Sequence, residues 1–403
     1  MSNMQIYKRI EQAVIVAGGR GERMRPFTDA HPKPLYPVCG KPFISRLIDQ
    51  IKTFGIKRIV ILLGYLAEQV VEELGDGRKN GIEVSYDIAP VEFETGDRLI
   101  HALPLLDENF LMMYCDNYCP INFENLEDSF FKNNAAVQLS VYSNKDHYTK
   151  DNVIVNDGKV FAYDKSRKQP GLAGVDIGYA LIQKTVVSSL TKNVGNFEKA
   201  VYGNLVQEGK LYATVTDHRY YSIGSFERLS LTEEFFKEKK VVFLDRDGTI
   251  NVKPPRACYV EKPEDFIWIP GAIEAIKELN DHGVITILIT NQPGIARGNI
   301  TKEELDAIHA KMQADLKEYG AKIDHIYCCF HDWDEGCDCR KPKPGLLYQA
   351  QKDLSLDLTK CVFFGDDERD MEAGKAAGCR SIVIDETNTL LKAVQHYFFE
   401  IDG

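Results

Sequence analysis

The sequence predicts an α/β protein made of two doubly wound domains. Apolar segments of strand length alternate with segments of helical periodicity through the first part of the chain, which is the pattern of a sheet covered by helices. A second set of apolar strands begins at Val241, and its members end abruptly in polar residues, as buried parallel strands do. The length of 403 residues is large for one hydrophobic core, which also favours two domains.

The composition is that of a globular protein and limits its partners. Lys and Arg total 49 against 60 Asp and Glu, a net charge of -11, which argues against nucleic acid or an anionic membrane as the main partner. The start has no apolar signal segment and no later run is long enough to span a bilayer, so we expect a cytoplasmic location. Whether the protein forms a homo-oligomer is left open.

A predicted strand at 12–17 leads into a segment rich in glycine and arginine. Glycines let backbone N–H groups approach phosphate oxygens, and arginine guanidinium groups can fork onto them. Lys33 follows between two prolines, whose rigid rings hold its ammonium in one place. The segment lacks the Gly-Lys-Ser/Thr ending of a P-loop and the third glycine of a dinucleotide fingerprint. It is a candidate phosphate-binding loop of another kind, with Gly18, Gly19, Gly21, Arg23 and Lys33 as its functional residues.

The following elements alternate in type and lead to Asp116 at the end of a strand. This alternation implies a parallel sheet with helices packed on it. Further on, Asn156 to Gly158 predicts a hairpin turn, with Lys165 on the outgoing side. Helices are predicted at 43–54 and 67–74, and strands at 58–63, 82–86 and 110–115.

The segment from Ala17 to Pro42, AGGRGERMRPFTDAHPKPLYPVCGKP, resembles the signature of the sugar-phosphate nucleotidyltransferases, and the resemblance continues to about residue 230. It implies a Rossmann-like sheet and an NTP as substrate, with the glycine loop, Arg23 and Lys33 acting on the phosphates. By the same resemblance, Asp116 holds Mg²⁺, Lys165 grips the sugar phosphate and Asp176 contacts the sugar.

Two positions depart from that family's pattern. Where the family commonly has an aspartate as second metal ligand, this chain has Ser222, and a neutral hydroxyl is a much poorer ligand for Mg²⁺. Either Asp116 and the phosphates hold the ion, or this domain is slow or inactive. The stretch Glu92 to Asp97 departs from the glycine-rich form usual in base recognition, which leaves the choice of nucleotide open.

The segment Ser225 to Lys240 has a helical pattern and becomes highly charged toward its end. We place the domain boundary there, with a first domain of residues 1–236 and a second of residues 237–403. The connection is short, so we expect the two domains to touch, although channelling between their sites does not follow from that.

The predicted strand Val241 to Leu244 ends in Asp245 and Asp247. Carboxylates two residues apart lie on the same side of an extended backbone, so they can share a metal ion and a phosphate oxygen, while Gly248 lets the chain turn away. Taken alone, this pattern is as typical of an acidic turn. Three later groups favour the functional interpretation, at 290–298, 340–341 and 365–367.

These four motifs, in this order, resemble the haloacid dehalogenase superfamily, specifically its small phosphatases that act on heptose bisphosphate or histidinol phosphate. The second domain would then be a Rossmannoid phosphatase. Asp245 would attack phosphorus to form an aspartyl phosphate, with Asp247 protonating the leaving oxygen and later activating water. Mg²⁺ would be held by Asp245, Asp366 and the backbone carbonyl of Asp247. Thr290 and Lys341 complete the catalytic set, and the candidate substrate-binding residues are Asn291, Arg297 and Arg340.

One short loop holds four soft or borderline metal ligands in the pattern C-x-H-x₅-C-x-C, namely Cys329, His331, Cys337 and Cys339. Such a set closes a tetrahedral Zn²⁺ site and can fold a loop too short for its own core. A reducing compartment makes metal binding a better interpretation than disulfides. Cys328 is more typical of a core cysteine, although a shift in register could exchange it with Cys329. Similar zinc loops occur in the phosphatases that this domain resembles.

Together the two resemblances imply a bifunctional sugar-nucleotide enzyme. One half would remove the 7-phosphate of a heptose 1,7-bisphosphate, and the other would join the resulting heptose 1-phosphate to an NTP. GTP is favoured because manno-configured sugars resemble the substrates of guanylyltransferases. The fusion favours heptose over histidinol phosphate, since only a sugar 1-phosphate makes sense of both halves. The alternative, motivated by Ser222, is an active phosphatase with a non-catalytic or differently specific transferase-like regulatory domain.

Overall fold

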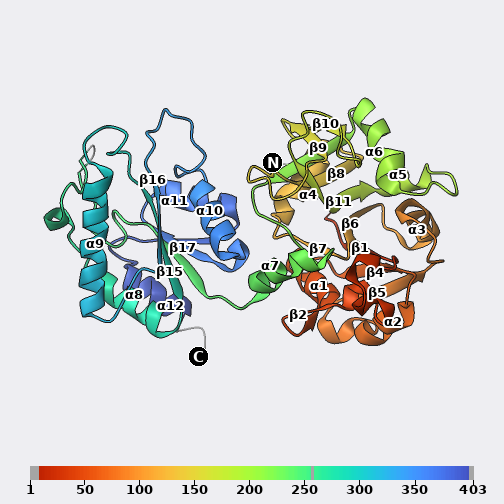
Figure 1. Cartoon of the computed structure of the whole chain (residues 1–403), viewed down its shortest axis with the longest axis horizontal. Coiled ribbons are helices and arrows are strands. Elements are labelled where there is room, and N and C mark those ends of the chain that lie inside the picture. The colour runs from red at the N-terminus through yellow and green to blue at the C-terminus, as the bar shows by residue number, and fades with distance from the viewer. Residues whose placement is uncertain (1–8, 256–257, 399–403) are drawn as a thin grey trace, which may run out of the picture. The chain divides into compact units, whose positions relative to one another are not determined.

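A computed structural model describes residues 9–255 and 258–398 (Figure 1). Contacts within the chain divide it into two compact units, Met1–Lys237 and Glu238–Gly403. Each unit is a sheet with helices on both faces. No helix within the described ranges is long and apolar enough to cross a membrane.

The described part of the first unit is built around a nine-stranded sheet with the order β5-β4-β1-β6-β11-β8-β12-β10-β9. Strands β5, β4, β1 and β6 are parallel, which confirms the arrangement predicted for the early strands. The whole sheet is mixed, because the predicted β9–β10 hairpin reverses the chain and β11 runs antiparallel to both β6 and β8. The strands are β1 Gln12–Ala17, β2 Pro37–Val38, β3 Lys41–Pro42, β4 Arg58–Leu63, β5 Glu83–Ile88, β6 Asn109–Tyr114, β7 Asn117–Tyr118, β8 Val137–Tyr142, β9 Val153–Asn156, β10 Lys159–Tyr163, β11 Val175–Gln183, β12 Leu211–Thr216 and β13 Tyr221–Ser222.

Helices cover both faces of this sheet because its central strands bury side chains on both. In β1, Ala13, Ile15 and Ala17 point into one core, and Val14 and Val16 point into the other. The first core is covered by α1 Phe43–Thr53, α2 Ala67–Leu74, α4 Phe123–Lys132 and α7 Phe226–Phe236, and the second by α3 Thr95–His101, α5 Lys184–Ser188 and α6 Phe197–Gln207.

The second unit has a five-stranded parallel sheet in the order β16-β15-β14-β17-β18. In β14, Val242 and Leu244 point to one core, and Val241 and Phe243 point to the other. Helices α8, α9 and α12 cover the first of these cores, and α10 and α11 cover the second (Figure 1). The elements are β14 Val241–Leu244, α8 Ala272–Asp281, β15 Ile285–Asn291, α9 Lys302–Glu318, β16 His325–Cys329, α10 Gly345–Leu354, β17 Val362–Gly365, α11 Glu368–Ala377, β18 Arg380–Val383 and α12 Leu390–Phe398.

The helix predicted over Ser225 to Lys240 is shorter in the structure. It ends at Phe236, and Lys237 is already extended, with φ of -60° and ψ of 136°. Leu229 and Phe235 anchor α7 in the first core, whereas the charged residues after Phe236 offer no apolar side chain to bury. The helical pattern therefore ends where its packing ends.

Candidate active sites

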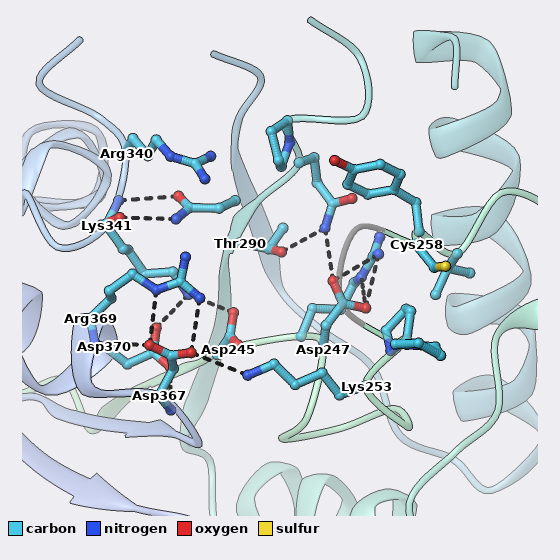
Figure 2. Close-up of a pocket in the computed structure, with 18 of the residues that line it drawn as sticks. Asp245, Asp247, Lys253, Cys258, Thr290, Arg340, Lys341, Asp367, Arg369 and Asp370 are labelled. Carbon is cyan, nitrogen blue, oxygen red and sulfur yellow. Dashed lines mark hydrogen bonds and ion pairs between the residues drawn. The ribbon is translucent and has the colours of Figure 1, made fainter. Parts of the chain in front are cut away.

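The carboxyl ends of three neighbouring strands in the second unit meet at one pocket (Figure 2). Asp245 follows β14, Thr290 lies near the end of β15, and Asp366 and Asp367 follow β17; of these two, Asp367 lines the pocket and Asp366 is not among the described residues that line it. Because these strands are parallel, their ends lie at the same edge of the sheet. The pocket has a volume of about 520 Å³, and the predicted site residues that line it are Asp245, Asp247, Thr290, Asn291, Arg297, Arg340 and Lys341.

Lys341 is the fixed positive charge of this pocket. Its buried ammonium donates to Asp245 Oδ1 at 2.5 Å and to the carbonyl of Ile289 at 2.9 Å, and it pairs with Asp370 at 2.7 Å. Asn291 holds the backbone of Lys341, donating to its carbonyl at 3.1 Å and accepting from its amide at 3.1 Å. Asn291 therefore positions the lysine beside the predicted nucleophile as well as lining the pocket.

Asp370 is a site residue that the sequence analysis missed. One of its carboxylate oxygens lies within 4.8 Å of ligand oxygens of Asp245 and Asp366. Asp370 is the third residue of α11 and accepts from the amide of Asp367 in a capping box, which is an ordinary reason for an acid at that position. The available signal was its spacing of four residues from Asp366, which brings both acids to the start of one helix.

These three carboxylates, Asp245, Asp366 and Asp370, fit a divalent cation. Asp366 Oδ1 is buried and has no hydrogen-bond partner among the described residues. Burial raises the pKa of Asp245 to about 6 although Lys341 opposes this, as expected where buried carboxylates outnumber the ammonium between them. Gly248 has a φ of 101° and lies so close to Asp366 that any side chain there would overlap the carboxylate. Carboxylate oxygens are the ligands that Mg²⁺ prefers in proteins.

The Asp247 carboxylate has different partners and lies outside this group. It accepts from Arg246 at 3.0 Å, from Asn251 at 2.9 Å and from Gln292 at 3.1 Å. Burial opposes ionisation, but Arg246 and these hydrogen bonds hold the pKa of Asp247 below its ordinary value. Arg246 is itself buried against His309, whose pKa is lowered to about 4 by burial and by Arg246. Asp247 is therefore a positioned carboxylate, separate from the cation group.

Arg297 and Arg340 line the pocket but are tied to other loops. The Arg297 guanidinium forks onto Asp332 at 2.6 and 2.7 Å and donates to the Tyr259 hydroxyl at 2.7 Å. Arg340 donates to the carbonyl of His331 at 3.2 Å. Arg297 thus connects three loops of the pocket wall, and its predicted contact with a second anionic part of the substrate stays a prediction.

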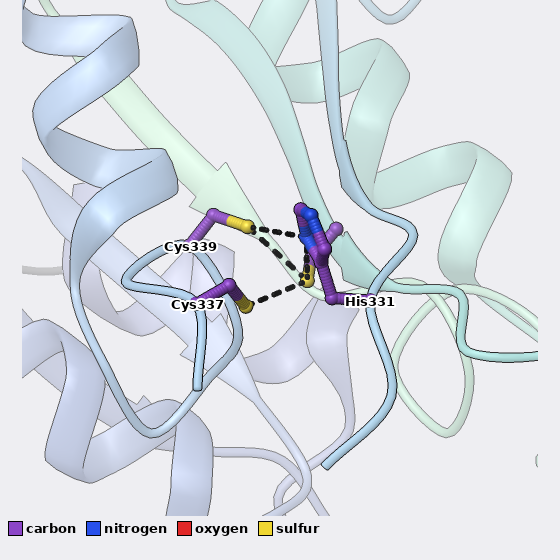
Figure 3. A group of neighbouring side chains, drawn as sticks. His331, Cys337 and Cys339 are labelled. Atoms are coloured by element: carbon purple, nitrogen blue, oxygen red, sulfur yellow. Dashed lines mark hydrogen bonds between the residues drawn. The ribbon is translucent and has the colours of Figure 1, made fainter. Parts of the chain in front are cut away.

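Cys329 is the last residue of β16, and its side chain meets those of three residues in the following loop, namely His331, Cys337 and Cys339, which Figure 3 labels. Their ligand atoms all lie within 4.8 Å of one another, with Sγ of Cys329 3.3 Å from that of Cys339 and 3.8 Å from that of Cys337. Cys328 packs in the core on the opposite face of β16, and burial raises the pKa of its thiol to about 11. The structure therefore brings Cys329 rather than Cys328 into a group that can hold one metal ion.

In the first unit, the glycine loop and Asp116 meet at the carboxyl edge of β1 and β6, which are parallel neighbours. The ammonium of the buried Lys33 lies 2.5 Å from Asp116 Oδ2. The cavity at this edge has a volume of about 540 Å³ and combines backbone amides, cations and a carboxylate, which suits a triphosphate with its divalent cation. The predicted residues that line it are Gly18, Gly19, Gly21, Arg23, Lys33 and Asp116.

Arg98 in α3 is a second residue that the sequence analysis missed. Its buried guanidinium donates to the carbonyls of Gly18 at 3.1 Å, Leu63 at 2.7 Å and Pro90 at 2.9 Å. Arg98 thereby fixes the glycine loop to the ends of β4 and β5, and it lines the cavity. The sequence carried no signal for this role, because an arginine in a helix is ordinarily solvated.

Lys165 and Asp176 are not among the described residues that line this cavity. Lys165 donates to the buried carboxylate of Glu198 at 2.7 Å, and Glu198 also accepts from the hydroxyl of Tyr114, which does line the cavity. Asp176 accepts from Tyr163 at 3.2 Å, and burial raises its pKa to about 6. Tyr114 and Glu198 therefore connect Lys165, the predicted sugar-phosphate residue, to the cavity that holds the glycine loop.

Ser222 lies beside the predicted Mg²⁺ ligand. It is opposite Asn117 in the antiparallel pair β13–β7, and its hydroxyl accepts from the amide of Gly224 at 2.9 Å. Gly224, the residue that donates to Ser222, also lies near Arg23 and Asp116. A methyl group added to Gly224 would lie 3.7 Å from the Arg23 guanidinium and 3.9 Å from Asp116 Oδ2. A carboxylate at position 222 would therefore stand close to Asp116.

Two family models match the chain. The nucleotidyl transferase model matches residues 12–157, and the haloacid dehalogenase-like hydrolase model matches residues 181–378. The second match begins inside β11, although β11 is hydrogen-bonded between β6 and β8 of the first sheet. Its first residues therefore overlap the first unit, and the hydrolase sheet itself begins with β14.

The chain is also similar to individual known proteins. The D-glycero-beta-D-manno-heptose-1,7-bisphosphate 7-phosphatase of Pseudomonas putida is 40% identical over 145 residues, which are 36% of this chain and 82% of that protein. The solved D,D-heptose 1.7-bisphosphate phosphatase from B. bronchiseptica, complexed with magnesium and phosphate, is 32% identical with a TM-score of 0.38 and covers 40% of this chain and 99% of its own. HddC from Yersinia pseudotuberculosis is 23% identical with a TM-score of 0.49 and covers 57% of this chain and 100% of its own. The chain therefore belongs to the D-glycero-beta-D-manno-heptose-1,7-bisphosphate 7-phosphatase family of haloacid dehalogenase-like hydrolases, and it carries a nucleotidyl transferase domain ahead of that hydrolase.

Proposed function

We propose that the protein removes the 7-phosphate of D-glycero-D-manno-heptose 1,7-bisphosphate with residues 237–403 and joins the resulting heptose 1-phosphate to an NTP with residues 1–236. The observation that carries this proposal is the convergence of Asp245, Lys341, Asp366 and Asp370 in a chain of this phosphatase family. The product of the first reaction is a sugar 1-phosphate, which a nucleotidyl transferase can use, and this accounts for both domains in one chain.

In the hydrolase, an Asp245 oxygen would attack the phosphorus, forming an aspartyl phosphate and breaking the bond to O7. Lys341 offsets the charge of a carboxylate meeting a phosphate. Asp247 would give O7 its proton and would then take a proton from the water that releases phosphate from Asp245. The approaching 7-phosphate, a dianion, would raise the pKa of Asp247, which favours the protonated form needed in the first step.

Mg²⁺ would be held in the hydrolase by Asp245, Asp366 and the backbone carbonyl of Asp247, with Asp370 beside them. Asp370 shares Lys341 with Asp245, so its role is either ligand or partner of the lysine. When bound, the ion supplies positive charge to the phosphoryl oxygens. In the transferase, Asp116 would hold a second Mg²⁺.

In the transferase, an oxygen of heptose 1-phosphate would attack the α-phosphorus of the NTP, and the bond to the β-phosphate would break to release pyrophosphate. The nucleophile is already an anion, so no general base is required. Arg23, Lys33 and the amides of the glycine loop would carry the charge of the triphosphate. GTP is favoured because the proposed sugar is manno-configured, as in the substrates of guanylyltransferases.

Product release tests both halves. Phosphate release is measured with heptose 1,7-bisphosphate and with histidinol phosphate, and pyrophosphate release with heptose 1-phosphate and a panel of NTPs. The proposal expects both products with the heptose substrates and the fastest pyrophosphate release with GTP. Phosphate release without pyrophosphate from any NTP would favour a non-catalytic transferase-like domain. A preference for histidinol phosphate would exclude the heptose assignment.

For the cysteine and histidine group we propose Zn²⁺, because four such ligands close a tetrahedral site. Protein purified without chelator is expected to contain one zinc per chain, and strong chelation should remove it and make the Cys329–Cys339 loop sensitive to protease. Mg²⁺ should not restore protection. A reducing compartment such as the cytoplasm, where we place the protein, keeps these thiols available.

Metal analysis of two variants tests this zinc site. Cys337→Ser should lose the metal, whereas Cys258→Ser, which changes an exposed cysteine outside the group, should keep it. Absence of zinc from the unmodified protein would contradict the assignment.

Replacing Ser222 by Asp is expected to lower the Mg²⁺ concentration needed for pyrophosphate release by about tenfold or less. A carboxylate would replace a neutral hydroxyl beside the divalent ion, while the cost of placing a charge at the buried position 222 offsets part of the attraction. The measurement is a Mg²⁺ titration of initial rates at saturating NTP, with Ser222→Asn as the uncharged control of similar size. An unchanged Mg²⁺ dependence in Ser222→Asp would show that the ion lies elsewhere.

A further inference from the structure

Two lysines face the acidic group of the phosphatase pocket, and they are held very differently. The side chain of Lys341 is 4% exposed, and its ammonium pairs with Asp245 and Asp370 and donates to a backbone carbonyl. The side chain of Lys253 is 46% exposed, and its ammonium lies 2.6 Å from Asp366 Oδ2. It also lies 3.2 Å from Asp367 Oδ2, the contact that Figure 2 shows. Packing therefore holds the ammonium of Lys341 in one place, whereas the half-exposed side chain of Lys253 has room to change conformation.

Lys253 contacts the cation group and also lines the pocket. It lies in the connection that follows β14 and Asp245, and it lines the same pocket as Asp245 and Lys341. Its partner Asp366 presents the other oxygen, Oδ1, buried and without a hydrogen-bond partner among the described residues. Asp366 thus has one oxygen paired with a half-exposed ammonium and one that fits a metal ion.

A divalent cation on Asp366 and the ammonium of Lys253 repel each other at contact distances. The carboxylate also loses negative charge to the ion, so the Lys253 pair weakens when the ion binds. Lys253 has a flexible four-carbon stem and a half-exposed position, so its ammonium can turn toward the pocket, where the substrate brings anionic oxygens.

We propose that Lys253 is an exchangeable counter-ion: it holds Asp366 until a divalent cation binds, and it then pairs with an oxygen of the substrate's phosphoryl group. This inference rests on the proposed phosphatase site. It makes Lys253 a substrate-binding residue in the loaded enzyme and a competitor of the cation in the free enzyme.

The proposal implies that binding of the cation and binding of phosphate are linked. In the free enzyme, the cation must displace Lys253, which weakens its affinity. A phosphate in the pocket gives the displaced ammonium a new partner, so the cation and phosphate should each strengthen the binding of the other by the same factor. Removing the ammonium should strengthen cation binding alone and reduce the mutual effect.

Isothermal titration calorimetry of the full-length protein with Mg²⁺, with and without inorganic phosphate, tests this; every protein titrated also carries Asp116→Ala, so that the proposed second Mg²⁺ site does not contribute. In Lys253→Met, Mg²⁺ is expected to bind about tenfold more tightly than in wild type without phosphate, and phosphate should no longer strengthen its binding. Lys253→Arg keeps the charge and should resemble wild type. Lys277→Met removes a lysine that pairs with Asp281 on α8, so it controls for net charge and should also resemble wild type.

The results separate the role proposed for Lys253 from an effect of net charge and from failure of the proposed metal site. Equal or weaker Mg²⁺ binding in Lys253→Met than in wild type would overturn the inference, as would an equal gain in Lys277→Met, which would reduce the effect to net charge. Phosphate strengthening Mg²⁺ binding equally in wild type and Lys253→Met would overturn the second half of the proposal. Absence of Mg²⁺ binding in all four proteins would instead contradict the metal site of the proposed function.

Discussion

Replacing Asp245 by Asn is expected to lower phosphate release from heptose 1,7-bisphosphate by on the order of a thousandfold or more. The amide keeps the shape of the side chain but has no anionic oxygen to attack phosphorus. Lys341 retains Asp370 as a partner at 2.7 Å, so the pocket should keep its structure. Initial rates of phosphate release, with thermal unfolding as the check on folding, give the measurement.

The same variant should leave pyrophosphate release nearly intact, because the nucleophile serves only its own domain. Asp281→Asn, which changes an exposed acid on α8, is the matched control and should keep both activities. Loss of both activities in folded Asp245→Asn protein would contradict the two-site assignment. Near-normal phosphate release would place the nucleophile elsewhere.

Replacing Asp116 by Ala is expected to lower pyrophosphate release by roughly a hundredfold or more while phosphate release continues. The change removes the carboxylate that lies 2.5 Å from Lys33 and faces the glycine loop. The neighbouring Ser222 hydroxyl cannot replace its charge. Arg23→Ala and Lys33→Ala should also affect only this reaction, since both line the same cavity.

The measurement for Asp116→Ala is the initial rate of pyrophosphate release at saturating NTP and Mg²⁺. Asp49→Ala provides the control, because Asp49 is an exposed acid of α1 that also pairs with a lysine, Lys41. If Asp116→Ala keeps a near-normal rate, Asp116 is not the metal ligand and the ion must be held by other groups.

The sequence by itself determined the places where reactive side chains would gather. Asp245, Thr290 and Asp366 each stand at or just after the end of an apolar strand, and parallel strands of one sheet end at the same edge. In the first unit, β1 and β6 are parallel neighbours, so the same rule accounts for the meeting of the glycine loop and Asp116, although the sequence analysis took the role of Asp116 from a family resemblance. The cysteine and histidine group was also predictable, because its ligands lie so close in sequence that one loop can bring them together.

Only the tertiary structure decided which side chains these residues meet. Asp370 stands where helices often carry a capping acid, and Arg98 lies in a helix, where arginines are ordinarily solvated, so the local sequence did not indicate the contact of Asp370 with Lys341 or of Arg98 with Gly18. The direction of β11 and the pairing of Lys165 with Glu198 were likewise outside the local pattern. Local sequence sets the periodicity and the ends of strands and helices, but hydrogen-bond and ion-pair partners depend on which distant segments the packed cores bring side by side.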